Sequence, residues 1–279
     1  PDGCAPGRRH RAGLTLTGVP ASLLGLRPLL RPVRIRQLRW QRRWHDWRGG
    51  VHFAGRQIPD PLPVRIVRHR SLLLRRLGTT DPQLQRNKVV NLRLASPGFD
   101  GLLIHPGETL SVWKRIGRPT AARGYLPGVQ LSHGRVVEGV GGGLCQLANL
   151  IHWMALHSPL ELVERHHHSF DPFPDDGRVL PFGSGASLFY NYVDLRFHNP
   201  TEQILQLRIW VDDTHLSGEI RAEHLPPLAY HVFETDQHIE QQGERRFRCN
   251  RIWQRQVDRR SGAVVAERLL YSNRSLVMY

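Results

Sequence analysis

The stretch Gly141-Gly142-Gly143-Leu144-Cys145-Gln146 decides the fold of the central part of the chain. Its three glycines leave the approach to Cys145 free of side chains. The apolar run that follows, from Gln146 to His157, has the composition of a helix that Pro159 ends. A thiol in the first turn of a helix lies at the positive end of the helix dipole, which lowers its pKa. We therefore expect a helix that starts at the Gly-Cys motif and presents Cys145 as a nucleophile.

A histidine cluster, Glu164-Arg165-His166-His167-His168, starts 19 residues after this cysteine. In an extended segment alternate side chains share a face, so His166 and His168 are expected to point the same way and His167 the other way. Either of the first two could serve as a base or an imidazolium partner for the thiol. Two alternatives stay open. One is a buried structural cysteine beside a solvated histidine run, and the other is a Cys-His-His zinc site, although no ligand spacing demands it.

The rest of the sequence predicts an α+β protein, with a small mixed sheet around the Gly-Cys helix. We expect a basic, partly helical segment over residues 1–84, a central domain over 85–225 and a β-hairpin extension over 226–279. Strand composition is found at 160–165, 189–197, 205–211, 217–222, 247–256 and 263–271. Asn199-Pro200 is expected to join the second and third of these strands as a hairpin.

Positive charge is concentrated near the beginning of the sequence. Residues 1–80 contain 17 arginines and three aspartates, a net charge of +14, whereas the other 199 residues carry 22 basic and 21 acidic side chains, a net +1. Residues 31–48 hold seven of these arginines, with Trp40, Trp44 and Trp47 spaced to share one helix face.

This basic helix is expected to contact an anionic membrane surface, with its rings at headgroup depth. The alternative is a helix that packs its tryptophan face onto the domain and leaves its arginines in solvent. Basic and aromatic residues also alternate in proteins that bind single-stranded nucleic acid. No recognised nucleic-acid motif accompanies them here, so nucleic acid is not the expected partner.

The three cysteines, Cys4, Cys145 and Cys249, are more than a hundred residues apart and form no CxxC pair. This spacing supports neither a zinc knuckle nor a thioredoxin-type redox pair, and no metal is the expected cofactor. Neither Cys4 nor Cys249 has glycine-rich or histidine-rich neighbours. Cys145 is thus the predicted reactive thiol.

Five motifs, in the order in which they occur, resemble those of the VanW family. They are Asn91-Leu92-Arg93-Leu94-Ala95-Ser96, His105-Pro106-Gly107-Glu108-Thr109, Trp113-Lys114, the Gly-Cys motif and the histidine cluster. The resemblance covers residues 85–225. Members of this family are accessory proteins of vancomycin type B resistance clusters and their relatives, and some multidomain relatives are associated with L,D-transpeptidase activity.

The resemblance implies a cysteine acyltransferase that acts on peptidoglycan stem peptides and needs no cofactor or metal. Cys145 would attack the carbonyl of the diamino-acid residue and expel D-alanine, after which an amine of a second stem would release the enzyme. His166 or His168 would supply a proton. Backbone N–H groups at the helix start and the amide of Gln146 would line the oxyanion hole. The alternative is a non-catalytic accessory domain that binds a cell-wall peptide or a protein partner.

The matched motifs and the residues beside them also supply candidates for substrate binding, namely Glu108, Trp113, Tyr125, Asn149 and Arg165. For Trp113 and Tyr125 the alternative role is core packing. For Glu108 it is to cap or brace the Gly-Cys loop.

The chain departs from the family pattern at one position. Relatives commonly carry an Asp-Ala-Thr-Val element where this sequence reads Gly185-Ala186-Ser187-Leu188. If that aspartate orients a histidine or a substrate amine, another acid must replace it here. Asp171, Asp175 and Asp176 are the candidates.

The transpeptidase interpretation implies a place in the cell envelope, because cross-linking substrates lie outside the membrane. The stretch Leu14–Leu30 follows three arginines as a signal sequence would, but polar residues and a proline interrupt it. No run approaches the length and apolar character of a transmembrane helix. The other expected location is cytoplasmic or membrane-peripheral.

Overall fold

The computed structural model describes residues 27–74, 81–132, 135–167, 170–171 and 180–279. Its helices are α1 (Arg27–Arg48), α2 (Pro82–Ala95), the short turns η2 (Ser96–Gly98) and η3 (Ala121–Arg123), α3 (Val112–Ile116) and α4 (Cys145–Leu156). Its strands are β1 (Val64–Leu72), β2 (Leu102–Ile104), β3 (Thr109–Ser111), β4 (Pro127–Ser132), β5 (Arg135–Val140), β6 (Glu161–Glu164), β7 (Phe170–Asp171), β8 (Arg196–His198), β9 (Leu205–Val211), β10 (His215–Ala222), β11 (Leu228–Gln242), β12 (Arg245–Asp258) and β13 (Val264–Val277). The fold class is α+β, as predicted.

Local sequence explains where the helices of the central region begin. The carboxylate of Asp81 accepts a hydrogen bond of 2.7 Å from the backbone N–H of Gln83, and Pro82 occupies the first turn, so α2 starts there. Ser111 caps α3 in the same way, at 3.2 Å from the N–H of Lys114. Helix α4 begins at Cys145, as predicted, but no side chain caps it.

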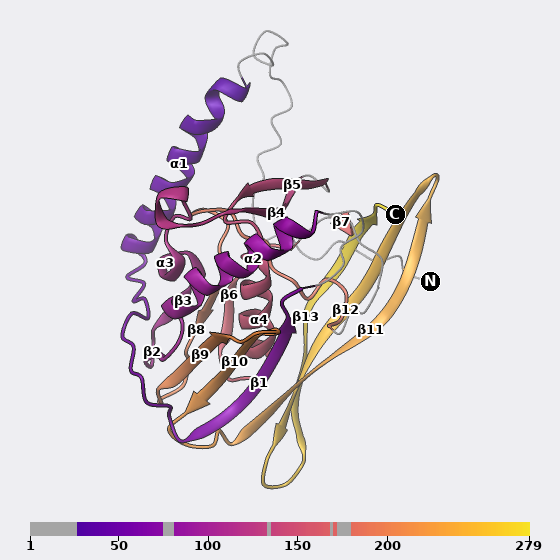
Figure 1. The fold of residues 1–279 in the computed structure, drawn as a ribbon. Coiled ribbons are helices and arrows are strands. Elements are labelled where there is room, and N and C mark those ends of the chain that lie inside the picture. Colours follow the sequence, from indigo (N-terminus) through magenta and orange to yellow (C-terminus); the bar gives the residue numbers. More distant parts are fainter. Residues whose placement is uncertain (1–26, 75–80, 133–134, 168–169, 172–179) are drawn as a thin grey trace.

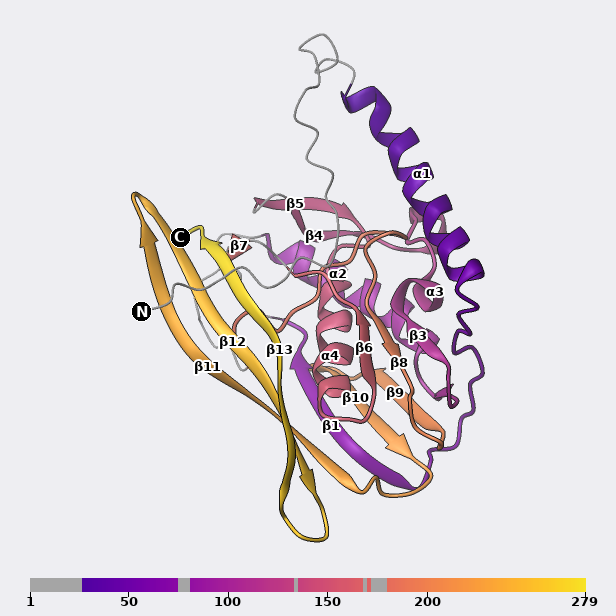
Figure 2. The ribbon, with the colours of Figure 1, turned by 180° about the vertical axis from the view of Figure 1, so that it is seen from behind.

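The main sheet has the strand order β1-β10-β9-β2, with antiparallel pairing throughout. Helix α4 packs on this sheet, and the long C-terminal strands lie on the side of α4 that faces away from the sheet (Figures 1 and 2). A Cβ at Gly218 of β10 would come within 2.8 Å of the Cε of Met154, so this glycine allows α4 to approach closely. Strand β1 precedes residue 85, and the sheet therefore extends across the boundary predicted there.

The expected hairpin through Asn199-Pro200 is wrong. Strand β8 begins only at Arg196 and pairs with β3 and β6 in a separate sheet, whereas β9 pairs with β10 and β2. The chain before β8 closes on itself, with the N–H of Phe189 2.9 Å from the carbonyl oxygen of Val193. Asn199 is fully buried, and its amide donates to the carbonyl oxygen of Ile104 at 2.8 Å, which turns the chain from one sheet to the other.

The C-terminal hairpin is confirmed, because β12 and β13 pair along their length, and β11 extends them to a three-stranded ribbon. Short strand β7 joins the edge of β13. The ribbon also contacts the central domain. The amide of Gln254 donates to the carbonyl oxygen of Leu156 at the end of α4 at 2.6 Å, and that of Asn250 donates to Phe182 at 2.7 Å. These buried hydrogen bonds tie the ribbon to α4 and to the loop around residue 182.

Helix α1 forms over the arginine-rich segment, as predicted, and its first half projects beyond the body of the molecule (Figure 1). Its second half lies along the central domain, near α3. Within the part of the chain that the structure describes, no helix is long and apolar enough to cross a membrane.

Candidate functional site

The glycine run before α4 is a tightly packed turn. Gly141 and Gly143 have φ angles of +78° and +91°, which side chains rarely adopt. A Cβ at Gly142 would lie 2.1 Å from the carbonyl carbon of Gly128, and one at Gly143 would lie 2.1 Å from the Cγ of Lys88. These glycines therefore serve close backbone packing against β4 and α2. The idea that they keep the approach to the cysteine open does not explain them.

Asn91, the first residue of the first family motif, holds this turn from α2. Its side chain is fully buried, and its amide donates to the carbonyl oxygens of Leu126 and Gly142 at 2.9 Å each. Its oxygen accepts from the N–H of Leu126 at 2.8 Å. One side chain thus joins Leu126, just before β4, to the glycine turn, and so fixes where α4 and its cysteine begin.

The expected lowering of the thiol pKa is wrong. The side chain of Cys145 is only partly exposed, and burial raises the pKa of its thiol above the ordinary value. Backbone hydrogen bonds from Leu188 and from Cys145 itself act in the opposite direction but are the smaller effects. Burial takes away more of the hydration free energy of the thiolate than the helix dipole and these hydrogen bonds replace. The resting side chain is therefore a thiol.

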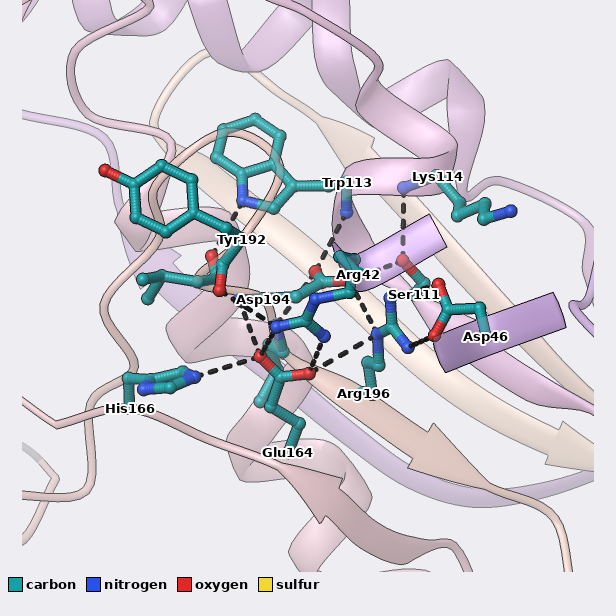
Figure 3. A network of polar contacts seen from close by, with 12 residues as sticks. Arg42, Asp46, Ser111, Trp113, Lys114, Glu164, His166, Tyr192, Asp194 and Arg196 are labelled. Carbon is teal, nitrogen blue, oxygen red and sulfur yellow. Dashed lines mark hydrogen bonds and ion pairs between the residues drawn. The ribbon is translucent and has the colours of Figure 1, made fainter. Parts of the chain in front are cut away.

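The histidines are only partly within the described residues. His168 lies outside them. His166 is exposed, and its Nε2 is 2.9 Å from Oε1 of Glu164, as Figure 3 shows. His167 is exposed as well. Among the hydrogen bonds of the described residues, none joins the ring of His166 to Cys145. A histidine next to the sulfur therefore stays a prediction.

The backbone nevertheless brings the cysteine and the histidine segment to one place. Leu188 hydrogen-bonds to the thiol of Cys145, and the neighbouring Ser187 donates its N–H to the carbonyl oxygen of His166 at 2.7 Å. Cys145 and His166 thus contact adjacent residues of the dipeptide Ser187-Leu188. This is the closest connection that the described residues make between the two motifs.

Glu164 is the acidic residue that sequence analysis missed. Besides His166, it binds the guanidinium of Arg42 through both carboxylate oxygens, and it accepts from the backbone N–H of Asp194 at 3.0 Å. Burial would raise the pKa of Glu164, but these hydrogen bonds and the charge of Arg42 outweigh it and lower the pKa to about 2. The residue is therefore a carboxylate at neutral pH. Its spacing of two residues from His166 could have indicated this contact, because alternate residues of an extended segment share a face.

The same ion-pair network docks α1 on the domain (Figure 3). Arg196 of β8 binds Asp46 of α1 at 2.5 and 3.0 Å, and its Nε is 3.0 Å from the buried carboxylate of Asp194. Asp194 in turn accepts from the hydroxyl of Ser111 at 2.5 Å. The network thus joins residues that are far apart in the sequence, and within it Glu164 contacts Arg42, Arg196 and His166.

One face of α4 is covered by the segment that includes Gly185, the position at which the family resemblance led us to expect an aspartate. Asn149, one turn after Cys145, accepts from the N–H of Ala186 at 2.8 Å. Arg165 donates its Nε to the carbonyl oxygen of Gly185 at 3.0 Å, and another of its nitrogens donates to Gly183. Asn149 and Arg165, predicted to bind substrate, therefore hold the segment that lies beside the cysteine.

A buried histidine continues this face of α4 and was also missed. The ring of His152 is fully buried, with its Nδ1 2.7 Å from the carbonyl oxygen of Ser184, and burial lowers its pKa to about 3. The ring of Tyr271 from β13 lies 6.0 Å away, and burial raises the pKa of Tyr271 to about 12. Arg165 stacks on that ring at 3.8 Å. An apolar helical run hides such a histidine from sequence analysis.

The other predicted site residues make contacts within the fold, and a role for them toward a substrate stays a prediction. The amide of Gln146 donates to the hydroxyl of Ser71 and the carbonyl oxygen of Leu72, at 2.9 and 2.8 Å, so it binds β1. Glu108 caps its own turn by accepting from the N–H of His105 at 2.9 Å. Trp113 and Tyr125 are both buried in the core.

Two further features lie apart from Cys145. A cleft of about 620 Å³ is lined by Gln57, Asp100 and Trp210 among others, and none of its lining residues is a predicted site residue. No group of three histidine, cysteine, aspartate or glutamate side chains is placed to hold a metal ion among the residues that the structure describes, a set without His168.

Comparison with known proteins agrees with these motifs. The family described as VanW like protein matches residues 87–221. The vancomycin B-type resistance protein VanW of Enterococcus faecalis is 31% identical over 196 residues, which cover 70% of this chain and 71% of that protein. The uncharacterized protein YoaR of Bacillus subtilis is 29% identical over 121 residues, which cover 42% of this chain but only 37% of that protein. No solved structure matches.

The identity to the enterococcal protein extends over most of both chains, and the family match contains Asn91, the glycine turn, Cys145 and the histidine cluster. The chain belongs to the VanW family.

Proposed function

We propose that this protein is a cell-wall protein related to vancomycin resistance, and that it transfers acyl groups of peptidoglycan stem peptides through Cys145. Its relative from Enterococcus faecalis is named a vancomycin B-type resistance protein. The observation that carries the proposal is the position of Cys145 at the start of α4, where it and His166 flank the same dipeptide, Ser187-Leu188.

Acylation begins from a neutral thiol, because burial raises the pKa of Cys145. In the bound complex His166 takes the thiol proton through the ring nitrogen that does not face Glu164, while the sulfur bonds to the carbonyl carbon of the diamino-acid residue. The carboxylate of Glu164 stabilises the imidazolium that forms. His166 is thus the proposed base, and Glu164 is a positioning residue.

The tetrahedral intermediate then collapses. The backbone N–H groups of Cys145 and Leu188, which bond to the sulfur, would stabilise the oxyanion that forms next to it. The imidazolium of His166 gives its proton to the amine of D-alanine as the C–N bond breaks, which leaves a thioester on Cys145. An amine of a second stem attacks this thioester. A new C–N bond forms, the C–S bond breaks, and the amine proton returns through His166 to the sulfur.

A second candidate function is a non-catalytic domain that binds a stem peptide. The neutral, partly buried thiol and the orientation of the His166 ring toward Glu164 favour it. In that case the glycine turn and the cysteine would serve folding, and the surface beside residues 183–188 would bind the peptide.

Intact mass spectrometry separates the two candidates. The full chain is incubated with a disaccharide stem tetrapeptide that ends in D-alanine, and both the protein mass and the free D-alanine are measured. We expect an adduct of the stem tripeptide in the wild type and in Cys249→Ala, and none in Cys145→Ala. His166→Gln should slow acylation about a hundredfold, the usual contribution of a general acid–base.

His168→Gln, measured alongside, decides which histidine acts. An adduct that persists in Cys145→Ala contradicts the assignment of the nucleophile. Bound tetrapeptide without an adduct and without released D-alanine supports the non-catalytic candidate instead.

A further inference from the structure

The two sides of α1 are in different surroundings. On the side toward the domain, Arg39 donates to the carbonyl oxygen of Tyr190 at 2.8 and 3.1 Å. Arg42 binds Glu164, and Asp46 binds Arg196. These contacts, spaced three and four residues apart, fix the rotation of the helix about its axis.

The opposite side exposes large aromatic rings. Trp40 is 65% exposed, Trp44 is 39% exposed and Trp47 is 78% exposed. The rings of Trp40 and Trp44 lie nearly parallel, with centroids 6.5 Å apart, so they form a continuous strip along the helix. The alternative in which these rings pack onto the domain is therefore wrong. Adjacent exposed tryptophans are costly in water, and such a patch indicates a binding surface.

The charges around the tryptophan strip are all of one sign. Arg34, Arg36, Arg43 and Arg48 are exposed, and the guanidinium of Arg48 lies 5.2 Å from the centre of the Trp44 ring. Asp46 is the sole acidic residue in the sequence of α1, and Arg196 neutralises it. The exposed face of the helix is thus apolar and aromatic in the middle, cationic at its edges and complementary to a surface with negative charge.

We propose that this face of α1 binds the surface of an anionic phospholipid bilayer. The tryptophan rings lie at headgroup depth, and the arginines contact lipid phosphates. The helix lies along the membrane plane. Helix α1 lies at the edge of the molecule away from the C-terminal ribbon, so a flat surface can reach its exposed side without touching that ribbon (Figures 1 and 2). Arg42, on the side of the same helix that faces the domain, binds Glu164, which in turn contacts His166. The membrane would therefore lie about one helix diameter, 10–12 Å, from Glu164.

Vesicle co-sedimentation of the full chain tests this proposal. We expect binding to vesicles of phosphatidylglycerol and phosphatidylcholine, little binding to phosphatidylcholine alone, and weaker binding as salt increases. The triple variant Trp40→Ala/Trp44→Ala/Trp47→Ala should lose binding about tenfold or more. Arg36→Gln/Arg43→Gln should lose about tenfold, and brominated lipids should quench the fluorescence of the wild type but not of the triple variant.

Arg259→Gln/Arg260→Gln is the matched control, since it removes the same charge from two exposed positions in the β12–β13 turn and should bind as the wild type does. Thermal unfolding monitored by circular dichroism confirms that each variant is folded. Equal sedimentation of the wild type and the triple tryptophan variant overturns the proposal. So does a wild type that ignores anionic vesicles but binds single-stranded oligonucleotides or pairs with a second copy through the same tryptophans.

Discussion

The two sides of the candidate site are held by different forces. Cys145 is positioned by close backbone packing and by the neutral amide of Asn91, all within α2, β4 and α4. His166 is positioned by charge, through Glu164 and the arginines that surround it, one of which comes from α1. The place of the cysteine should therefore respond to changes in shape, and that of the histidine to changes in charge and pH.

The largest expected effect is on the packed side. Gly142→Ala would place a methyl group 2.1 Å from the carbonyl carbon of Gly128, and the two backbones must separate. We expect a loss of about 3 kcal/mol or more in the free energy of unfolding, measured with urea. Gly107→Ala is the control, since its added methyl group would meet no atom within 4 Å. Its cost should be about 1 kcal/mol, because the φ of Gly107 is positive, whereas that of Gly142 is not. Equal losses would show that packing at the turn is unimportant.

Acid titration tests the charged side. The pKa of Glu164 is lowered from 4.5 to about 2, so its carboxylate stabilises the fold fully above pH 4.5 and loses this contribution as the pH falls toward 2. The wild type should lose about 3 kcal/mol over that interval because of this residue. Urea unfolding at several pH values measures the loss, and Glu164→Gln should lack it.

Glu161→Gln is the control for this titration, because Glu161 is an exposed residue of the same strand, β6. It should retain the pH dependence of the wild type. A Glu164→Gln variant with unchanged pH dependence would remove Glu164 from the network.

A third measurement compares the sulfur with the histidine directly. Iodoacetamide should modify Cys145 before the fully buried Cys249, but the rate should still be rising at pH 9, because burial raises the thiol pKa. Peptide mapping identifies the modified residue, with Cys249→Ala as the control. His166→Gln should leave this pH profile of the free protein unchanged. Rapid modification at mildly acidic pH, abolished by that substitution, would show that the imidazole contacts the thiol without substrate.

The smallest effect is expected on the exposed face of α1. Trp47→Ala should change the free energy of unfolding by no more than about 0.5 kcal/mol, because the ring is mostly in solvent and charges dock the helix. Trp113→Ala, which removes a buried ring, should cost about 3–5 kcal/mol. Thermal or urea unfolding measures both. A comparable loss for Trp47→Ala would mean that its ring packs against the domain.

Local signals predicted several individual elements well. The glycine run and Pro159 predicted the helix from Cys145 to Leu156, and the regular spacing of tryptophans predicted α1. The paired β12 and β13 were also apparent from composition. These features depend on neighbours in the sequence, which is why pattern alone found them.

The charged side was beyond such patterns. Arg42 and Glu164 are 122 residues apart, and no local sequence records that they meet. The pKa of Cys145 was predicted in the wrong direction because the helix start is a local feature, whereas the burial that outweighs it comes from the fold. The exposed side of α1 depends on the same distant partners, and only their positions show which face docks.

The ribbon of β11, β12 and β13 makes contacts with α4 that lie outside the residues of the family match. The family match ends at residue 221, yet Gln254 donates a hydrogen bond to the last residue of α4, and the ring of Tyr271 contacts both His152 and Arg165. A fusion protein that ends at residue 221 would expose polar groups that the ribbon buries and hydrogen-bonds in the full chain. The transferable unit of this protein is therefore larger than its recognisable motif, and fusions that keep β11–β13 should fold where shorter ones fail.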